Sequence, residues 1–139
     1  MTMKYHGWVE IENQNAWKKH EENPTSFTYT DYLNEIHLVK SKLQSLINEN
    51  HFGIPSTEIT IMESIDDLIS VCISGQRNHW RSGPIDLLNW IKDNAPYSHG
   101  QIHINDDEHG TLDNRYIIYR LANNIIEELI DENLYPTQE

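Results

Sequence analysis

The chain has 139 residues, of which 37% are hydrophobic and 23% charged, a balance typical of one folded soluble domain and too apolar for a disordered chain. Its formal net charge of −12 opposes binding to nucleic-acid phosphates and to anionic lipid. No apolar run approaches the ~20 residues that a membrane-spanning helix needs, and the first residues lack the pattern of a signal peptide. We therefore expect a single domain over residues 1–139 in the cytoplasm.

The N-terminal segment predicts a strand followed by a loop. Residues 5–11 alternate between apolar and polar positions, which is the two-residue period of a strand and places Trp8 on the polar face. Residues 13–27 are polar and contain Asn-Pro, which is typical of a loop. Trp17 is the residue expected to anchor this loop.

A capped helix and a hairpin are predicted next. Thr28 precedes Asp31 by three residues, the spacing of a capping box. Apolar side chains then recur at helical spacing over 33–47, which predicts a long amphipathic helix. Two short alternating segments, 59–62 and 69–73, are separated by a polar turn and predict a β-hairpin.

A second helix is predicted after a polar loop over 75–81. Ser82 is positioned to cap this helix, and Pro84 lies in the first turn, where proline is tolerated. Leu87, Leu88 and Ile91 give the helix a buried side, and residues 94–96, Asn-Ala-Pro, end it.

The C-terminal part predicts further strands. Residues 102–104 and 116–122 are expected to be strands, and Asn123-Asn124 is a tight-turn signal. Residues 125–133 fit either a strand or a short helix, and the adjacent turn favours a strand. The whole order, β-α-β-β-α-β-β with a possible further strand, indicates an α+β fold. Its mainly antiparallel sheet of five or six strands would be covered on one face by two helices.

One histidine-rich segment offers the best case for enzymatic chemistry. His99, His103, Asp107 and His109 are residue types that bind zinc and other divalent metals, and the first two would share a face of a strand. A metal-dependent hydrolase is therefore an alternative function. No recognised ligand spacing such as His-Glu-x-x-His is present, so no metal site is assigned.

Other catalytic patterns are missing from the sequence. There is no Gly-x-Ser-x-Gly motif and no glycine-rich phosphate loop, and the single cysteine, Cys72, is interpreted as a small core residue. The basic cluster over 77–81 is interpreted as a loop whose arginines pair with nearby acids. We therefore expect no catalytic residue, no cofactor and no small-molecule substrate.

Protein binding is the class that these features favour. Nine acids lie between Asn105 and the C-terminus, and only Arg115 and Arg120 oppose them, so this quarter holds seven of the twelve net negative charges. Such a surface attracts a basic partner, and exposed tryptophans are common binding anchors. The predicted partner-binding residues are Asp106, Asp107, Glu108, Asp113, Glu127, Glu128, Asp131, Glu132, Trp8 and Trp80.

Three blocks of the sequence resemble a known family. Residues 5–11 (Tyr-His-Gly-Trp-Val-Glu-Ile), 78–88 (from Asn-His-Trp-Arg-Ser-Gly-Pro onward) and 95–108 (Ala-Pro-Tyr-Ser-His-Gly, ending in Asn-Asp-Asp-Glu) are similar to immunity protein family seven of bacterial polymorphic toxin and contact-dependent inhibition systems. The blocks occur in the family's order and span most of the chain.

The resemblance implies a non-enzymatic α+β protein that protects the producing cell by binding a cognate toxin domain. Toxins of these systems are often nucleases, whose nucleic-acid clefts are basic, so acidic segments of this chain are expected to bind such a cleft. An acidic scaffold or regulatory domain with another protein partner is the remaining alternative.

Overall fold

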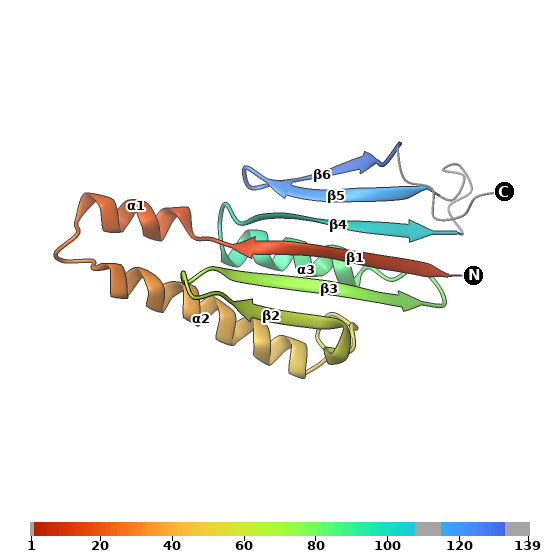
Figure 1. The fold of residues 1–139 in the computed structure, drawn as a ribbon, viewed down its shortest axis with the longest axis horizontal. Coiled ribbons are helices and arrows are strands. Elements are labelled where there is room, and N and C mark those ends of the chain that lie inside the picture. Colours follow the sequence, from red (N-terminus) through yellow and green to blue (C-terminus); the bar gives the residue numbers. More distant parts are fainter. Residues whose placement is uncertain (1, 108–114, 133–139) are drawn as a thin grey trace.

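A six-stranded sheet organises the chain, in a computed structural model that describes residues 2–107 and 115–132. The strand order is β2-β3-β1-β4-β5-β6, and every neighbouring pair is antiparallel (Figure 1). The elements in chain order are β1 (Met3–Ile11), α1 (Gln14–Glu22), α2 (Tyr29–Asn48), the 3-10 helix η1 (Ser56–Glu58), β2 (Ile59–Glu63), β3 (Ile69–Arg77), α3 (Gly83–Asn94), β4 (His99–Asp106), β5 (Tyr116–Ala122) and β6 (Ile125–Ile130).

Two helices cover one face of this sheet. In Figure 1, α2 and α3 lie behind the strands, whereas α1 extends past the end of β1 and packs against α2. The core lies between the helices and the sheet, since α2 buries Ile36, Val39, Leu43 and Ile47 there. The predicted α+β class and antiparallel sheet are confirmed. None of the described helices is both long enough and apolar enough to cross a membrane.

The prediction of a loop over residues 13–27 was wrong, because most of this segment is the helix α1. The Asn13 side chain caps it by accepting a hydrogen bond from the Ala16 backbone N–H at 3.1 Å. Ala16 is the one residue of α1 that is buried. Ala16 and Trp17 are the only apolar residues of α1 and are adjacent in sequence, so no apolar repeat at helical spacing marked this helix.

The capping box and the hairpin are confirmed. Asp31 N–H donates to the Thr28 hydroxyl at 3.2 Å, and Thr28 N–H donates to the Asp31 carboxylate at 2.8 Å. β2 and β3 pair in the hairpin, but β3 continues to Arg77 rather than ending before a loop at residue 75. The extension follows from β1, which pairs with β3 along its whole length up to Met3 opposite Arg77.

The second predicted helix begins where expected, but its cap differs. Ser82 occupies the N-cap position, but its side chain accepts no hydrogen bond from the backbone of the helix; the hydroxyl instead donates to the Asp86 carboxylate at 2.8 Å. Ser82 already has helical backbone angles, φ −78° and ψ −7°, which are not the extended angles of a capping residue.

The last element is a strand, as favoured from the sequence. Asn123 and Asn124 have positive φ angles of 52° and 62°, which fit a tight hairpin turn and join β5 directly to β6. β6 is an edge strand of the sheet.

Candidate functional site

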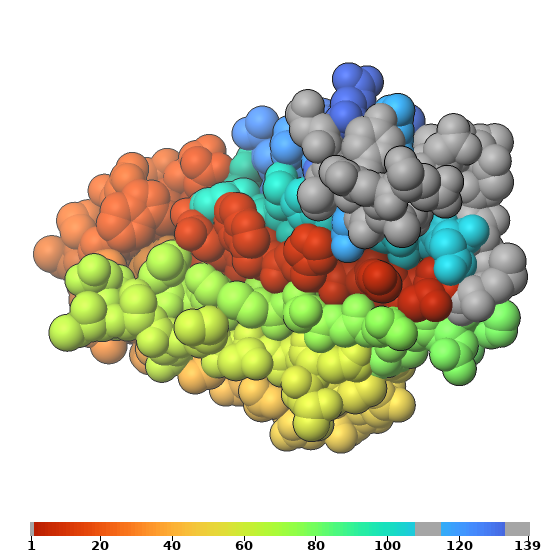
Figure 2. Space-filling view, turned by 45° about the vertical axis from the view of Figure 1, so that its right-hand side comes forward, coloured from red at the N-terminus to blue at the C-terminus, as the bar shows by residue number. Residues whose placement is uncertain are grey.

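One face of the sheet carries no helix of the described chain. Residues opposite one another in an antiparallel pair point to the same face, so the strand register identifies the side chains of this open face. In Figure 2, β1 (red) crosses the middle of it between β3 and β4. The open face presents Thr60, Met62, Ser70, Cys72, Ser74, Lys4, His6, Trp8, Glu10, His99, Gln101, His103, Ile118, Arg120, Glu127 and Leu129.

Trp8 stands beside a depression in this face, which we call the open-face hollow. The hollow has a volume of about 490 Å³ and is lined by Trp8, Glu10, Met62, Glu63, Ser64, Leu68, Ser70 and Cys72. Trp8 is 45% exposed and Met62 is 54% exposed, so about half of each of these large apolar side chains is accessible to solvent. The prediction that Trp8 lies on the polar face of its strand is confirmed.

The interpretation of Cys72 as a core residue was wrong. It lies opposite Trp8 and Thr60 and lines the open-face hollow, because it alternates with the buried residues Val71 and Ile73. Its thiol contacts the Met62 sulfur at 3.7 Å.

Two histidines stack on the open face next to Trp8. The rings of His6 and His103 are nearly parallel, with centroids 5.2 Å apart, and Gln101 contacts His103 Nε2 at 2.8 Å. Burial lowers the pKa of His103, and the neighbouring His6 and Arg120 lower it further against the opposing effect of Asp131. The neutral form of His103 is therefore favoured.

The predicted metal ligands do not converge in the described chain. His99 and His103 share the open face, as predicted, but they have different neighbours. His99 Nε2 lies 2.9 Å from the Glu10 carboxylate and its Nδ1 lies 3.6 Å from that of Glu12. These three side chains could approach a common ion, since their ligand atoms lie within 4.8 Å of one another.

The other two proposed ligands lie elsewhere. Asp107 is at the end of β4, where its carboxylate accepts a hydrogen bond from Thr2 N–H at 2.8 Å. His109 lies outside the described residues.

The predicted acidic residues separate into two groups. Asp106, Asp107, Asp131 and Glu132 lie at the end of the sheet where β1 begins, because Asp106 pairs with Met3 and Asp131 N–H donates to the carbonyl of Tyr116 at the start of β5. We call these four residues the acidic end.

Glu127 and Glu128 instead lie within β6 and point to opposite faces. Glu127 stands opposite Arg120 on the open face. Glu128 accepts a hydrogen bond from the Tyr119 hydroxyl at 3.4 Å, and burial followed by the Glu128 charge raises the pKa of Tyr119 to about 12. Glu108 and Asp113 lie outside the described residues.

Trp80 lies in the loop after β3, at the same end of the sheet as the acidic end. The neighbouring Arg81 N–H contacts the Met3 sulfur at 3.1 Å, which places this loop beside the start of β1. Arg77 pairs with the Glu58 carboxylate at 2.9 Å, as predicted for this basic cluster, but it is the last residue of β3 and not part of a loop. The Arg81 guanidinium donates to the Trp80 carbonyl at 3.0 Å. The structure thus separates Trp8 from Trp80 along the sheet.

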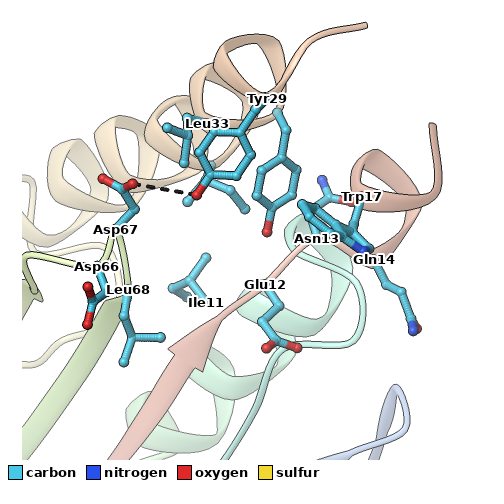
Figure 3. A pocket seen from close by; sticks show the side chains of 12 residues that line it. Ile11, Glu12, Asn13, Gln14, Trp17, Tyr29, Leu33, Asp66, Asp67 and Leu68 are labelled. Atoms are coloured by element: carbon cyan, nitrogen blue, oxygen red, sulfur yellow. Dashed lines mark hydrogen bonds between the residues drawn. The ribbon is translucent and has the colours of Figure 1, made fainter. Parts of the chain in front are cut away.

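A second cavity, the aromatic pocket, was not predicted. It lies between α1, α2, the end of β1 and the β2–β3 turn, and has a volume of about 390 Å³ (Figure 3). Trp17, Tyr29 and Tyr32 contribute its aromatic side chains, and Glu12, Asp66 and Asp67 contribute its carboxylates. The remaining lining residues are Ile11, Asn13, Gln14, Leu33, Ile36 and Leu68.

The sequence held one signal for the aromatic pocket. Tyr29 and Tyr32 are three residues apart at the start of a predicted helix and therefore share one side of it. Trp17 meets Tyr32 with ring centroids 5.2 Å apart, and that contact requires α1, the element assigned as a loop.

The fold and its exposed aromatic side chains define an α+β protein with an uncovered sheet face suited to protein binding. A comparison with family models identifies the particular group. The model described as Immunity protein 7 matches residues 2–139, and the chain belongs to this family. No curated protein and no solved structure matches the chain.

Proposed function

We propose that this chain is a cytoplasmic immunity protein that inhibits a cognate bacterial toxin domain by binding it one to one, without catalysis. The observation that carries the proposal is the family match over residues 2–139. The toxin would belong to a polymorphic toxin or contact-dependent inhibition system and would be a nuclease with a basic cleft. The net charge of −12 supports a basic partner and rapid association.

The proposed contact surface runs along the open face from the open-face hollow to the acidic end. Trp8 is the central anchor, because a half-exposed tryptophan beside a depression can bury a large area against a partner. A specific interface buries about 800 Å² on each partner, which is more than the acidic end alone supplies. The acids therefore contribute mainly to the rate of association and its dependence on salt.

The test is a binding titration with the toxin domain encoded beside this chain. The unmodified protein should bind with one-to-one stoichiometry and abolish toxin activity when equimolar. Trp8→Ala should weaken binding by about 30-fold or more, the loss expected for a hot-spot tryptophan. Asp107→Asn with Glu132→Gln should slow association and flatten its dependence on salt.

A matched control uses one acid of α2 and the acid at its C-cap, both on the side of the molecule away from the open face. Glu35→Gln with Glu49→Gln removes the same charge from two exposed positions and should leave the association rate closer to that of the unmodified protein. If both pairs changed the rate equally, the acidic end would have no special part in binding. If the unmodified protein did not bind or inhibit this toxin, the proposed pairing would be wrong.

A further inference from the structure

We infer that the aromatic pocket binds the guanidinium group of an arginine side chain presented by the protein partner. The identity of that partner rests on the proposed function, but the chemistry of the pocket does not. Three aromatic side chains and three carboxylates surround the same cavity of about 390 Å³. This combination fits a planar organic cation.

The aromatic side chains form walls at steep angles to one another. The Trp17 ring meets the Tyr32 ring at 72° and the Tyr29 ring at 89°, with centroids 5.2 and 6.4 Å apart. Trp17 remains 37% exposed and Tyr29 43% exposed, so part of each ring is open to solvent beside the cavity. Exposed tryptophan and tyrosine rings attract cations placed over their faces.

The carboxylates of this pocket have no lysine or arginine partner in the described chain. Asp67 accepts a hydrogen bond from the Tyr29 hydroxyl at 3.5 Å, drawn as a dashed line in Figure 3. Glu12 lies 3.6 Å from the His99 ring, and none of the described side chains lining the cavity is basic. Burial, followed by the charge of Glu12, raises the pKa of Tyr32, so the phenol stays protonated beside these acids. The pocket is negative and its charge is largely uncompensated.

The aromatic rings and the carboxylates together determine which cation fits the pocket. A guanidinium is flat, stacks on aromatic rings and donates several hydrogen bonds in one plane, whereas an ammonium is compact and strongly hydrated. Calcium and magnesium ions prefer six or more oxygen ligands, and aromatic rings supply none. Arginine is therefore the side chain that uses both the rings and the carboxylates.

A purely structural role explains only part of this arrangement. The contact of Trp17 with Tyr32 helps to hold α1 on α2, since α1 buries little else. That role requires neither the three carboxylates nor the exposed parts of the rings. The pocket also shares Leu68 with the open-face hollow, so a partner seated on the hollow lies next to it.

The first test uses arginine without any partner protein. N-acetyl-arginine amide is titrated into the full chain while the Trp17 indole signal is followed by NMR, and N-acetyl-citrulline amide serves as the uncharged equivalent. The arginine compound should give a saturable shift with a dissociation constant of about 1–10 mM, weakened by salt. An equal shift with the citrulline compound would overturn the inference.

Variants then separate charge from shape. Asp66→Asn with Asp67→Asn should reduce the affinity for the arginine compound by about fivefold or more. Asparagine tolerates the positive φ of 63° at Asp67, so the turn should keep its conformation. Glu35→Gln with Glu49→Gln is the matched control and should leave the affinity nearly unchanged. Equal losses in the two double variants would mean that net charge, and not the pocket, attracts the ligand.

The double variant Asp66→Asn with Asp67→Asn is then tested against the toxin domain. It should weaken toxin binding by about five- to fifty-fold, largely through faster dissociation. If it bound the toxin as tightly as the unmodified protein, the assignment of the pocket to an arginine of the partner would be wrong. If instead the unmodified protein failed to bind the toxin while the arginine titration succeeded, the proposed pairing would fail and the guanidinium site would stand.

Discussion

The carboxylate of Glu58 is the centre of a charged network whose loss should destabilise the fold measurably. It accepts hydrogen bonds from the Tyr5 hydroxyl at 3.1 Å, the Gln76 N–H at 3.3 Å and Arg77 Nη1 at 3.0 Å. Its second oxygen lies 2.9 Å from Arg77 Nη2. A Cβ at position 75 would collide with this carboxylate, so Gly75 provides the space it occupies.

The change Glu58→Gln keeps the shape of the side chain and removes its charge. The Glu58 and Arg77 side chains are 19% and 21% exposed, so the pair is partly shielded from water. Hydrogen bonds to charged groups contribute about 1.5–3 kcal/mol. Because the pair is partly exposed, we expect Glu58→Gln to lower the free energy of unfolding by an amount within this range. This is less than the ~3–5 kcal/mol lost when a fully buried pair is broken.

Urea denaturation followed by circular dichroism measures this free energy of unfolding. The midpoint should fall while the dependence on urea concentration stays the same, since the core is unchanged. Arg77→Gln and the double variant complete a cycle whose coupling energy should be about 1–3 kcal/mol. As a comparison, Glu63→Gln removes an exposed pair with Lys40 and should destabilise much less. A coupling energy near zero would refute the network as a stabilising feature.

Three further predictions concern the sheet. Gly100→Ala should cost about 1–3 kcal/mol, because its Cβ would collide with the backbone of Trp8 and β1 and β4 would have to move apart; thermal melting measures this. The pKa of His103 is lower in the folded state than its value of about 6.5 in the unfolded chain. The neutral ring therefore contributes to stability above pH ~6.5, and this contribution is lost as the pH falls from about 6.5 toward the folded pKa. Urea midpoints measured from about pH 7.5 to about pH 5 should therefore fall less steeply in His103→Gln, and identical profiles would contradict this cause. Asn124→Gly should stabilise the β5–β6 turn by up to about 1 kcal/mol, because glycine adopts the φ of 62° without strain, and an unchanged melting temperature would argue against strain there.

The strands were predictable because each half-buried strand repeats every two residues. In β1, the side chains of Tyr5 and Val9 are buried and those of His6 and Trp8 are exposed, as the sequence pattern indicates. α1 was missed because it is stabilised by the Asn13 cap and by contacts with α2, neither of which produces an apolar period. Cys72 was misplaced because its neighbours in sequence are apolar, whereas its face is fixed by pairing with Trp8.

The candidate site was predictable only in part, for a related reason. The exposure of Trp8 follows from local alternation, but the aromatic pocket combines residues from α1, α2, the end of β1 and a distant turn. Acids that are adjacent in sequence do not share a surface, since Glu127 and Glu128 point to opposite faces of the sheet. Composition thus indicated an acidic binding protein, and only the tertiary fold distributes the charges among surfaces.

The alternation in β1 also separates stability from recognition along one strand. β1 is central, with β3 on one side and β4 on the other, and its buried side chains belong to the core. On its other face, Trp8 and the half-buried Glu10 border the open-face hollow. Substitutions at these exposed positions can therefore change the partner contact with little effect on the free energy of unfolding, whereas a change at Val9 should lower stability first. Related proteins with the same scaffold can therefore differ at these exposed positions and still fold. Such variation would let each protein match one particular toxin.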